Sequence, residues 1–428
     1  MEQDKRKTGF FDAFLETMPS EERTHYLNGK LREIVAHAYA HSPAFRGKMD
    51  QAGCTIDDIQ SIDDLEKLPI TRREDLIAAQ KKTPPFGGFD AVPTEKMRRI
   101  YVSPGPVYEP GPWNYRDIRW TQALFAAGFR KGDIVQNTFS YHMWPFAFIL
   151  DESLKMIGCS VIPSGPGNSL VQLTIMRKLK ASGIVGTPSF LMTLAQRAES
   201  QGLNPRKDLN LKTGFVSAEM FPESLRGMLE SKLGIQVHQA YGTVTTGCLA
   251  YECPHGDGMH LCDNVIVEIV DPDTGKKMPR GSTGEIVATN FNKTYPMIRF
   301  ATGDLSYIKD ATCACGRTTP KIGKILGRTD QVTKVKGTFI HPWQTDDIIS
   351  RFPEVDKYQV VITREGYVDR MTFRIELRDE AVNRDILRAR LEREIKEILN
   401  VKGDVEFVVR GGIFDRHKKI DDQREWDH

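Results

Sequence analysis

The pattern of apolar positions along the chain changes near residue 99. Between residues 20 and 80 apolar side chains recur at helical spacing, and the run LNGKLREIVAHAYAHSPAF predicts a helix that stops at Pro43. After residue 99 short β-rich runs alternate with helical stretches. The predicted strands are 133–139, 160–163, 183–185 and 214–217, and the predicted helices are 116–129, 146–157, 168–181, 189–201 and 222–233. This alternation is typical of an α/β fold with a parallel sheet, in which loops at the carboxyl ends of the strands carry the chemistry.

The last third of the chain has a different pattern. The runs NVIVEIVD, GEIVATN and PMIRFATGDLSYI predict a β-rich part at about 250–325. Beyond a break at GRTDQVTKVKG, helical and strand patterns alternate in a way that predicts a small α+β unit. We therefore predict a large N-terminal domain over residues 1–329 and a mobile C-terminal domain over residues 330–428.

Composition excludes several classes of protein. The 428 residues are 40% hydrophobic and 27% charged, as in ordinary globular proteins. The net charge is only +2, so no large basic surface is available for nucleic acid. No apolar run reaches the roughly 18 residues of a membrane span, and no secretory signal precedes the first helices. The seven cysteines, an odd number, indicate a reducing cytoplasm. Together these properties predict a cytoplasmic protein that binds neither membrane nor nucleic acid.

The common nucleotide and hydrolase motifs G-x-x-x-x-G-K-[ST] and G-x-S-x-G are absent, and another set of segments is present. These segments are FRKGDIVQN (129–137), VIPSGPGN (161–168), GTPSF (186–190), VSAE (216–219), HQAYG (238–242), PMIRFATGD (296–304) and GRTD (327–330). With them the chain, from His37 to its end, resembles phenylacetate–CoA ligases, a branch of the AMP-forming adenylating superfamily. Such enzymes join a carboxylic acid to ATP, release pyrophosphate, and pass the acyl group from AMP to coenzyme A.

The resemblance implies a nucleotide site that uses Mg²⁺ and a chain that forms a homodimer. Tyr241 would lie on the adenine, Asp304 would bind the ribose hydroxyls, and Arg328 would bind ribose or phosphate. The segments beside them would border the base and the acyl pocket, namely Ser217, Ala218, Glu219, Gly242 and Thr243. Asp330 would be the hinge about which the C-terminal domain moves, and Lys336 would then reach the site for thioester formation.

The phosphate loop departs from the family pattern. In the family it is rich in Ser, Thr and Gly and ends in Gly-Lys, so that backbone N–H groups and the lysine surround the phosphates. Ser103 and Gly105 keep that character, but Pro104 and Pro106 remove backbone donors, and Glu109 stands at the position of the lysine. We expect that this loop does not bind phosphate in the usual way.

Two further positions depart from the family. Thr245 replaces a glutamate that is thought to hold Mg²⁺, and a hydroxyl is a weaker ligand for a hard cation. The family's adenylating lysine aligns with Arg416, although Lys418 or Lys419 would serve after a small shift. We favour a working ligase that handles phosphate differently. The alternatives are a non-adenylating relative that binds nucleotide or acyl-CoA as a sensor or scaffold, and an adenylating enzyme with an acceptor other than CoA.

The segment after the strand at 133–139 indicates the size of the acid. Aromatic-acid ligases have glycines there, whereas this chain has Phe139, Tyr141, His142 and Trp144. Because interiors are close-packed, large side chains predict a small acid, branched or hydroxylated, with Tyr141 and His142 as polar anchors. The competing interpretation is that His142 and Trp144 only pack the core.

Four residues have the composition of a structural zinc site. Cys253 and His260 are followed about fifty residues later by Cys313 and Cys315 in a Cys-x-Cys pair, which together supply four nitrogen and sulfur ligands. His255 and Cys262 are possible substitutes, and buried free cysteines are the alternative. A zinc ion here would hold the β-rich part together and take no part in catalysis.

Overall fold

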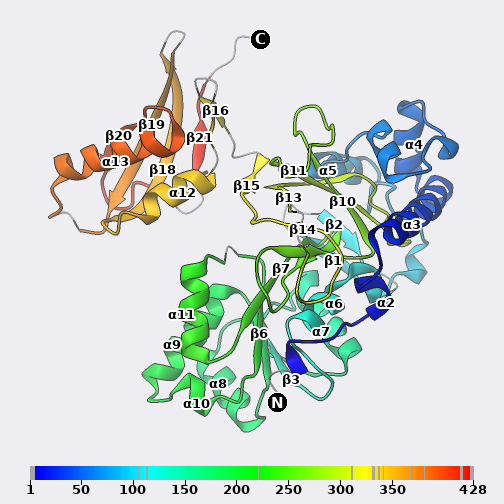
Figure 1. Cartoon of the computed structure of the whole chain (residues 1–428), viewed down its shortest axis with the longest axis horizontal. Helices are drawn as coiled ribbons and strands as arrows, with labels where there is room; N and C mark the ends of the chain where they lie inside the picture. Colours follow the sequence, from blue (N-terminus) through cyan, green and yellow to red (C-terminus); the bar gives the residue numbers. More distant parts are fainter. Residues whose placement is uncertain are drawn as a thin grey trace. The chain divides into compact units, whose positions relative to one another are not determined.

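The structure is a computed structural model that describes residues 5–103, 107–111, 114–219, 221–309, 312–329, 333–335, 338–340, 342–365, 368–379, 381–414 and 418–424. It divides into two compact units. The first consists of Met1–Thr302 and Tyr307–Lys324, and the second of Gly303–Ser306 and Ile325–His428 (Figure 1). Each unit has a hydrophobic core of its own.

The N-terminal segment is helical, and the predicted break at Pro43 is confirmed. Helix α3 ends at His41, and Ser42 is extended and accepts a hydrogen bond from the Phe45 N–H at 3.4 Å. Proline is tolerated at the first position of the next helix, where its missing N–H would have no partner. The helical elements of this segment are α2 (Ala13–Glu16), α3 (Ser20–His41), α4 (Pro43–Gln51), η1 (Ile56–Asp58), η2 (Ile62–Lys67), α5 (Arg73–Lys82) and η3 (Thr94–Lys96).

The first unit is built on a nine-stranded sheet, which confirms the predicted α/β class. Its order is β13-β14-β9-β8-β7-β6-β5-β3-β4, and β4, β3, β5, β6 and β7 are parallel. The strands are β3 (Ile134–Asn137), β4 (Ser160–Pro163), β5 (Gly183–Gly186), β6 (Thr213–Val216), β7 (Val237–Thr243), β8 (Gly247–Tyr251), β9 (Met259–Leu261), β13 (Ile308–Lys309) and β14 (Lys321–Ile322). The strands after β7 are antiparallel, so part of the predicted β-rich region extends the main sheet.

Helices cover both faces of the parallel part of the sheet (Figure 1). Successive residues of a strand point to opposite faces. On β6, Phe215 contacts Trp120 of α6, whereas Val216 belongs to the core cluster of α9 and α11. The helices of this part are η4 (Tyr115–Ile118), α6 (Trp120–Ala126), α7 (Pro145–Ile157), α8 (Ser169–Lys178), α9 (Pro188–Ser200), α10 (Pro205–Asp208) and α11 (Glu223–Leu233).

Two smaller β structures accompany the sheet. Strands β10 (Val265–Val270) and β11 (Gly284–Asn290) pair antiparallel. Strands β1 (Ile100–Ser103) and β2 (Val107–Pro110) form a hairpin that carries the candidate phosphate loop, in the register Ser103↔Val107 and Tyr101↔Glu109. The sequence did not predict this hairpin, because each strand has four residues and the intervening segment is rich in proline.

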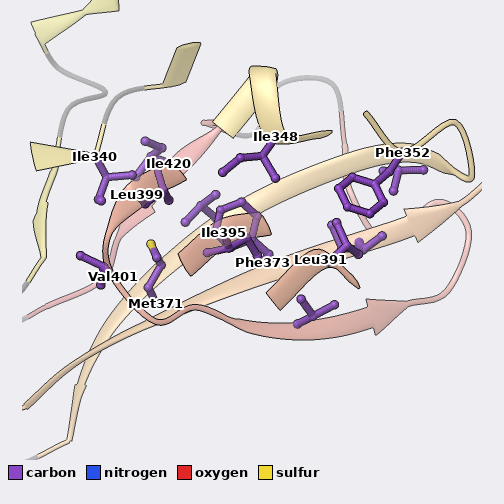
Figure 2. Close-up of a cluster of buried hydrophobic side chains, with 14 of the residues drawn as sticks. Ile340, Ile348, Phe352, Met371, Phe373, Leu391, Ile395, Leu399, Val401 and Ile420 are labelled. Carbon is purple, nitrogen blue, oxygen red and sulfur yellow. The ribbon is translucent and has the colours of Figure 1, made fainter. Parts of the chain in front are cut away.

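The second unit has a four-stranded sheet of order β20-β19-β18-β21 with two helices packed against it. Its elements are the second half of β12 (Phe300–Ser306), β15 (Gly327–Arg328), β16 (Thr333–Val335), β17 (Thr338–Ile340), α12 (Pro342–Ser350), β18 (Val355–Glu365), β19 (Val368–Leu377), α13 (Arg384–Leu399), β20 (Asp404–Val408) and β21 (Ile420–Asp422). Figure 2 shows the core, in which Phe373 of β19 lies with Leu391 and Ile395 of α13. The alternation of helical and strand patterns that predicted an α+β unit here is confirmed.

Replacing Phe373 by alanine is expected to destabilise the second unit by about 3–5 kcal/mol, because a fully buried ring is removed from this core. Calorimetry should show the loss as a lower unfolding temperature. Ile386→Ala on α13 is the matched control, since its side chain is 60% exposed. Equal stability of the two variants would contradict the packing described here.

Candidate functional site

Three of the sequence motifs meet at one edge of the main sheet. Strands β5, β6 and β7 are adjacent and parallel, so their carboxyl ends lie side by side. The GTPSF and VSAE segments begin at the last residues of β5 and β6, and AYGT forms the last four residues of β7. The edge of a parallel sheet at the strand carboxyl ends is where α/β proteins bind their ligands. Ser217, Glu219 and Tyr241 are therefore brought to one region of the first unit.

Glu219 is bound to the start of helix α9. Its carboxylate accepts hydrogen bonds from the Ser189 hydroxyl at 2.8 Å and from the Ser189 N–H at 3.1 Å. Thr187 caps the same helix by accepting from the Phe190 N–H at 3.3 Å. A negative charge is favourable at a helix N-terminus. This role of Ser189 was not predicted from the sequence, although the Thr-Pro-Ser start of a helix was the available signal.

The turn after Tyr241 is held by several polar contacts. Ser217 donates its hydroxyl hydrogen bond to the Ala240 carbonyl at 3.2 Å, next to Tyr241. The Thr243 hydroxyl oxygen accepts from the Thr246 N–H at 3.0 Å. A Cβ on Gly242 would lie 2.3 Å from the Gly247 carbonyl oxygen, so only glycine fits there. Gly242 and Thr243 are thus required to shape the turn that follows the candidate adenine-binding tyrosine.

Glu109 on strand β2 is buried, with 3% of its surface exposed. Its Oε1 atom accepts hydrogen bonds from the Ser103 hydroxyl at 2.9 Å and from the Thr245 hydroxyl at 3.1 Å. Burial raises the pKa of this carboxyl group to about 7, because no full hydration shell is available to the charged form. The two positions at which the phosphate loop and the Tyr241 turn depart from the family are therefore in direct contact. Each of the two departures was recognised from the sequence, but their contact was not predicted.

The candidate acid-binding side chains separate into two pairs. Phe139 is buried against Phe146, with ring centroids 4.7 Å apart, and the Tyr141 hydroxyl bonds Asn137 at 2.9 Å and Asp151 at 3.2 Å. His142 is exposed, and Trp144 is 47% exposed. The interpretation that His142 and Trp144 pack the core is therefore wrong. The role of His142 as a polar anchor stays a prediction.

In the second unit, Asp304 and Arg328 lie opposite each other on β12 and β15. Their side chains form an ion pair of 3.5 Å. Gly303, which precedes Asp304, has φ of 78°, a backbone conformation that favours glycine. The candidates Gly105, Asp330, Lys336 and Arg416 lie outside the described residues, as do Pro104 and Pro106.

Two C-terminal lysines have different surroundings. The Lys419 ammonium lies 2.6 and 2.7 Å from the two carboxylate oxygens of Asp346, which also accepts from the Tyr358 hydroxyl at 2.7 Å. The Lys418 side chain is exposed, and none of the residues that the structure describes bonds its ammonium group. Only its backbone carbonyl is engaged, by the Gln359 amide at 3.2 Å. Both lysines are exposed, and they differ in that Lys419 forms an ion pair with Asp346.

The donor atoms of Cys253, His260, Cys313 and Cys315 all lie within 4.8 Å of one another. The Cys253 and Cys313 sulfurs are 3.6 Å apart, and the Cys315 sulfur is 3.4 Å from His260 Nε2. Ligand atoms of a tetrahedral zinc site are about 3.5–3.8 Å apart when Zn–S is about 2.3 Å, so this cluster fits zinc. His260 Nδ1 lies 3.3 Å from the Thr319 carbonyl oxygen, and such a contact orients the ring of a histidine that binds a metal.

The possible substitutes are placed elsewhere. Cys262 is buried beside Cys248, and His255 is exposed. Neither belongs to the four-residue cluster found in the described part of the chain. In that same part, no helix has the length and apolar character needed to cross a membrane.

Known proteins match the chain over most of its length. The AMP-binding enzyme family model matches residues 122–292, and the AMP-binding enzyme C-terminal domain model matches residues 337–424. A phenylacetate-coenzyme A ligase of Thermus thermophilus is 31% identical over 417 residues, which cover 90% of this chain and 92% of that protein. The phenylacetate-coenzyme A ligase of Pseudomonas putida is also 31% identical, with 91% and 90% of the two chains covered.

Solved structures of a CoA ligase also match the chain over most of its length. A 2-hydroxyisobutyryl-CoA ligase in the postadenylation state, in complex with R3-HIB-AMP, is 26% identical with a TM-score of 0.81, covering 97% of this chain and 92% of that chain. An open conformation of 2-hydroxyisobutyryl-CoA ligase with 2-HIB-AMP and CoA is 25% identical with a TM-score of 0.82, covering 95% and 93%. From these matches and the motifs gathered at the sheet edge, we conclude that the chain belongs to the phenylacetate–CoA ligase family of AMP-binding enzymes.

Proposed function

We propose that this protein is an AMP-forming acyl–CoA ligase that acts on a small carboxylic acid. The observation that carries the proposal is the extent of the similarity, because ligases of this kind match 90% of the chain at 31% identity. The family models match segments of both structural units. The motifs that lie at the sheet edge are part of the same similarity.

The reaction has two steps. A carboxylate oxygen of the acid attacks the α-phosphorus of ATP, and pyrophosphate leaves. The sulfur of CoA then attacks the acyl carbonyl carbon, the thiol proton is lost, and AMP leaves. In this scheme Tyr241 lies on the adenine, Asp304 binds the ribose hydroxyls, and Arg328 binds ribose or phosphate. A C-terminal domain over residues 330–428 moves about Asp330 between the steps and presents Lys336 for the second.

We propose that the acid is small and either branched or hydroxylated. Phe139 supports this, since its buried ring packs in a region where aromatic-acid ligases have glycine. The likeness to 2-hydroxyisobutyryl-CoA ligase in complex with 2-HIB-AMP supports it independently. Tyr141 has a fixed orientation through Asn137 and Asp151, and with His142 it is proposed to bind the polar group of the acid.

Pyrophosphate release from ATP, with Mg²⁺ and CoA present, tests this function across short, hydroxylated and aromatic acids. We expect acid-dependent release, with a short branched or hydroxylated acid preferred over phenylacetate by at least tenfold in kcat/KM, about 1.4 kcal/mol of transition-state binding. A preference for phenylacetate would contradict the small-acid proposal. If protein that still binds ATP releases no pyrophosphate with any of these acids, the non-adenylating alternative would be favoured. Release without CoA consumption would indicate another acceptor.

Three further properties are proposed with this function. Cys253, His260, Cys313 and Cys315 hold a structural zinc ion, as the separations of their donor atoms support. The protein is proposed to be a homodimer, which light scattering on the purified protein would test. A cytoplasmic location is consistent with the free cysteines and stays a prediction.

A further inference from the structure

A buried acid that forms no ion pair with a described residue lies between the phosphate hairpin and the turn after Tyr241, although the more distant charge of Arg73 lowers its pKa. Glu109 reaches from β2 to Thr245, although the two residues are 136 positions apart in the chain. Both of its hydrogen bonds fall on Oε1, and no described residue donates to Oε2. No described lysine or arginine forms an ion pair with it. A buried carboxylate is costly unless a cation or several donors compensate it.

Residues with side-chain oxygen atoms and apolar residues together surround Glu109. A cavity of about 20 Å³ lies beside it, which is enough for one water molecule or one small cation. Five of the residues that line the cavity carry oxygen atoms, namely Tyr101, Glu109, Thr245, Asn292 and Tyr295. None of the described residues that line it is basic, and the other five are apolar. Mg²⁺ prefers oxygen ligands and is typically bound in proteins by one or two carboxylates together with substrate phosphates and water.

The position of the carboxyl group is also informative. Two links separate Thr245 Cβ from Glu109 Oε1, namely the bond from Cβ to the Thr245 hydroxyl oxygen and the hydrogen bond of 3.1 Å that this hydroxyl donates. This span is similar to the reach of a glutamate side chain from its own Cβ. The Glu109 carboxyl group therefore lies near the place that a glutamate at position 245 would occupy. Two glutamates would bring like charges together there, so an acid at one position disfavours an acid at the other.

We propose that Glu109 supplies, from strand β2, the carboxylate that binds the Mg²⁺ of ATP in this enzyme, in place of an acid at position 245. The proposal rests on the proposed function, since it assigns a ligand within the same nucleotide site. On this basis the carboxylate is supplied from position 109, where the family has it at position 245. The altered hairpin is then an adapted form of the site.

The test is the Mg²⁺ dependence of ATP binding, measured by calorimetry with and without Mg²⁺ for each variant. Glu109→Gln keeps an acceptor for Ser103 and Thr245 but removes the charge. We expect it to lose about tenfold of the Mg²⁺-dependent gain in ATP affinity, about 1.4 kcal/mol, with little change in Mg²⁺-free affinity. Glu95→Gln is the matched control, because Glu95 is exposed and undergoes the same chemical change.

The reciprocal variant E109T/T245E carries the same atoms with the carboxylate returned to position 245. We expect it to recover Mg²⁺-dependent binding to within about threefold of the wild type, whereas T245E alone is impaired by two adjacent carboxylates. Electron paramagnetic resonance of Mn²⁺ with ATP gives a second readout that does not depend on turnover. If the reciprocal variant does not fold, E109Q decides the question.

Unchanged Mg²⁺ dependence in E109Q would overturn the proposal, as would a reciprocal variant no better than T245E. These outcomes differ from failure of the proposed function, in which the wild type itself would show no acid-dependent pyrophosphate release. A wild type that turns over while E109Q keeps full Mg²⁺ dependence would assign Glu109 to a structural role only.

Discussion

Replacing Lys418 by alanine is expected to slow acyl-adenylate formation about 100- to 1,000-fold, the effect of removing one charged donor from a developing negative charge. Sequence alignment left Arg416, Lys418 and Lys419 as candidates for the adenylating cation. Both lysines are exposed, but Lys419 is bound to both carboxylate oxygens of Asp346, whereas no described residue bonds the Lys418 ammonium group. A compact ammonium group also suits the α-phosphate better than a planar guanidinium.

The two half-reactions distinguish this role from a loss of folding. Pyrophosphate release without CoA reports adenylation, and thioester formation from supplied acyl-AMP reports the second step. Lys418→Ala should slow the first by the stated factor and leave the second within about threefold. Lys419→Ala is the matched control, and we expect it to lower stability by at most about 1 kcal/mol, because its ion pair is exposed, with a smaller effect on adenylation. A larger kinetic effect in Lys419→Ala would contradict the assignment.

Removing the proposed zinc site is expected to have the largest effect on stability. Cys315→Ser should abolish zinc binding and lower the unfolding temperature of the first unit by about 10 °C or more, because metal binding contributes directly to folding. The cluster joins Cys253 and Cys313 across 60 positions of the chain. Arg317, next to it, forms a buried ion pair with Glu16 at 2.8 Å, so loss of the cluster would also loosen the N-terminal segment.

Metal analysis and calorimetry check this expectation. We expect one zinc per chain in fresh wild-type protein and a chelator-induced fall in unfolding temperature that Cys315→Ser does not show. Cys54→Ser is the control, because Cys54 lies outside the cluster and bonds only backbone carbonyls. Fresh protein without zinc would end the proposal, and the four side chains would then be ordinary buried thiols and a core histidine.

Local pattern was sufficient for most of the fold. The helical spacing before Pro43 and the strand–helix alternation after residue 99 correspond to observed elements, often to within one or two residues. Periodicity determines which face of a helix or strand is apolar, and this property depends on neighbouring residues only. The short hairpin β1–β2 was missed, since strands of four residues have too few positions for a period to show.

The family was also readable from the sequence, since its motifs are contiguous segments. The contacts between residues that are far apart in the chain could not be read from it. The contact of Glu109 with Thr245 and the binding of Lys419 by Asp346 join residues 136 and 73 positions apart. The cluster of Cys253, His260, Cys313 and Cys315, as distinct from sets with His255 or Cys262, was likewise decided by the folded chain. Such contacts depend on strand order and on which side chains are buried together, and one sequence contains no local pattern that records either.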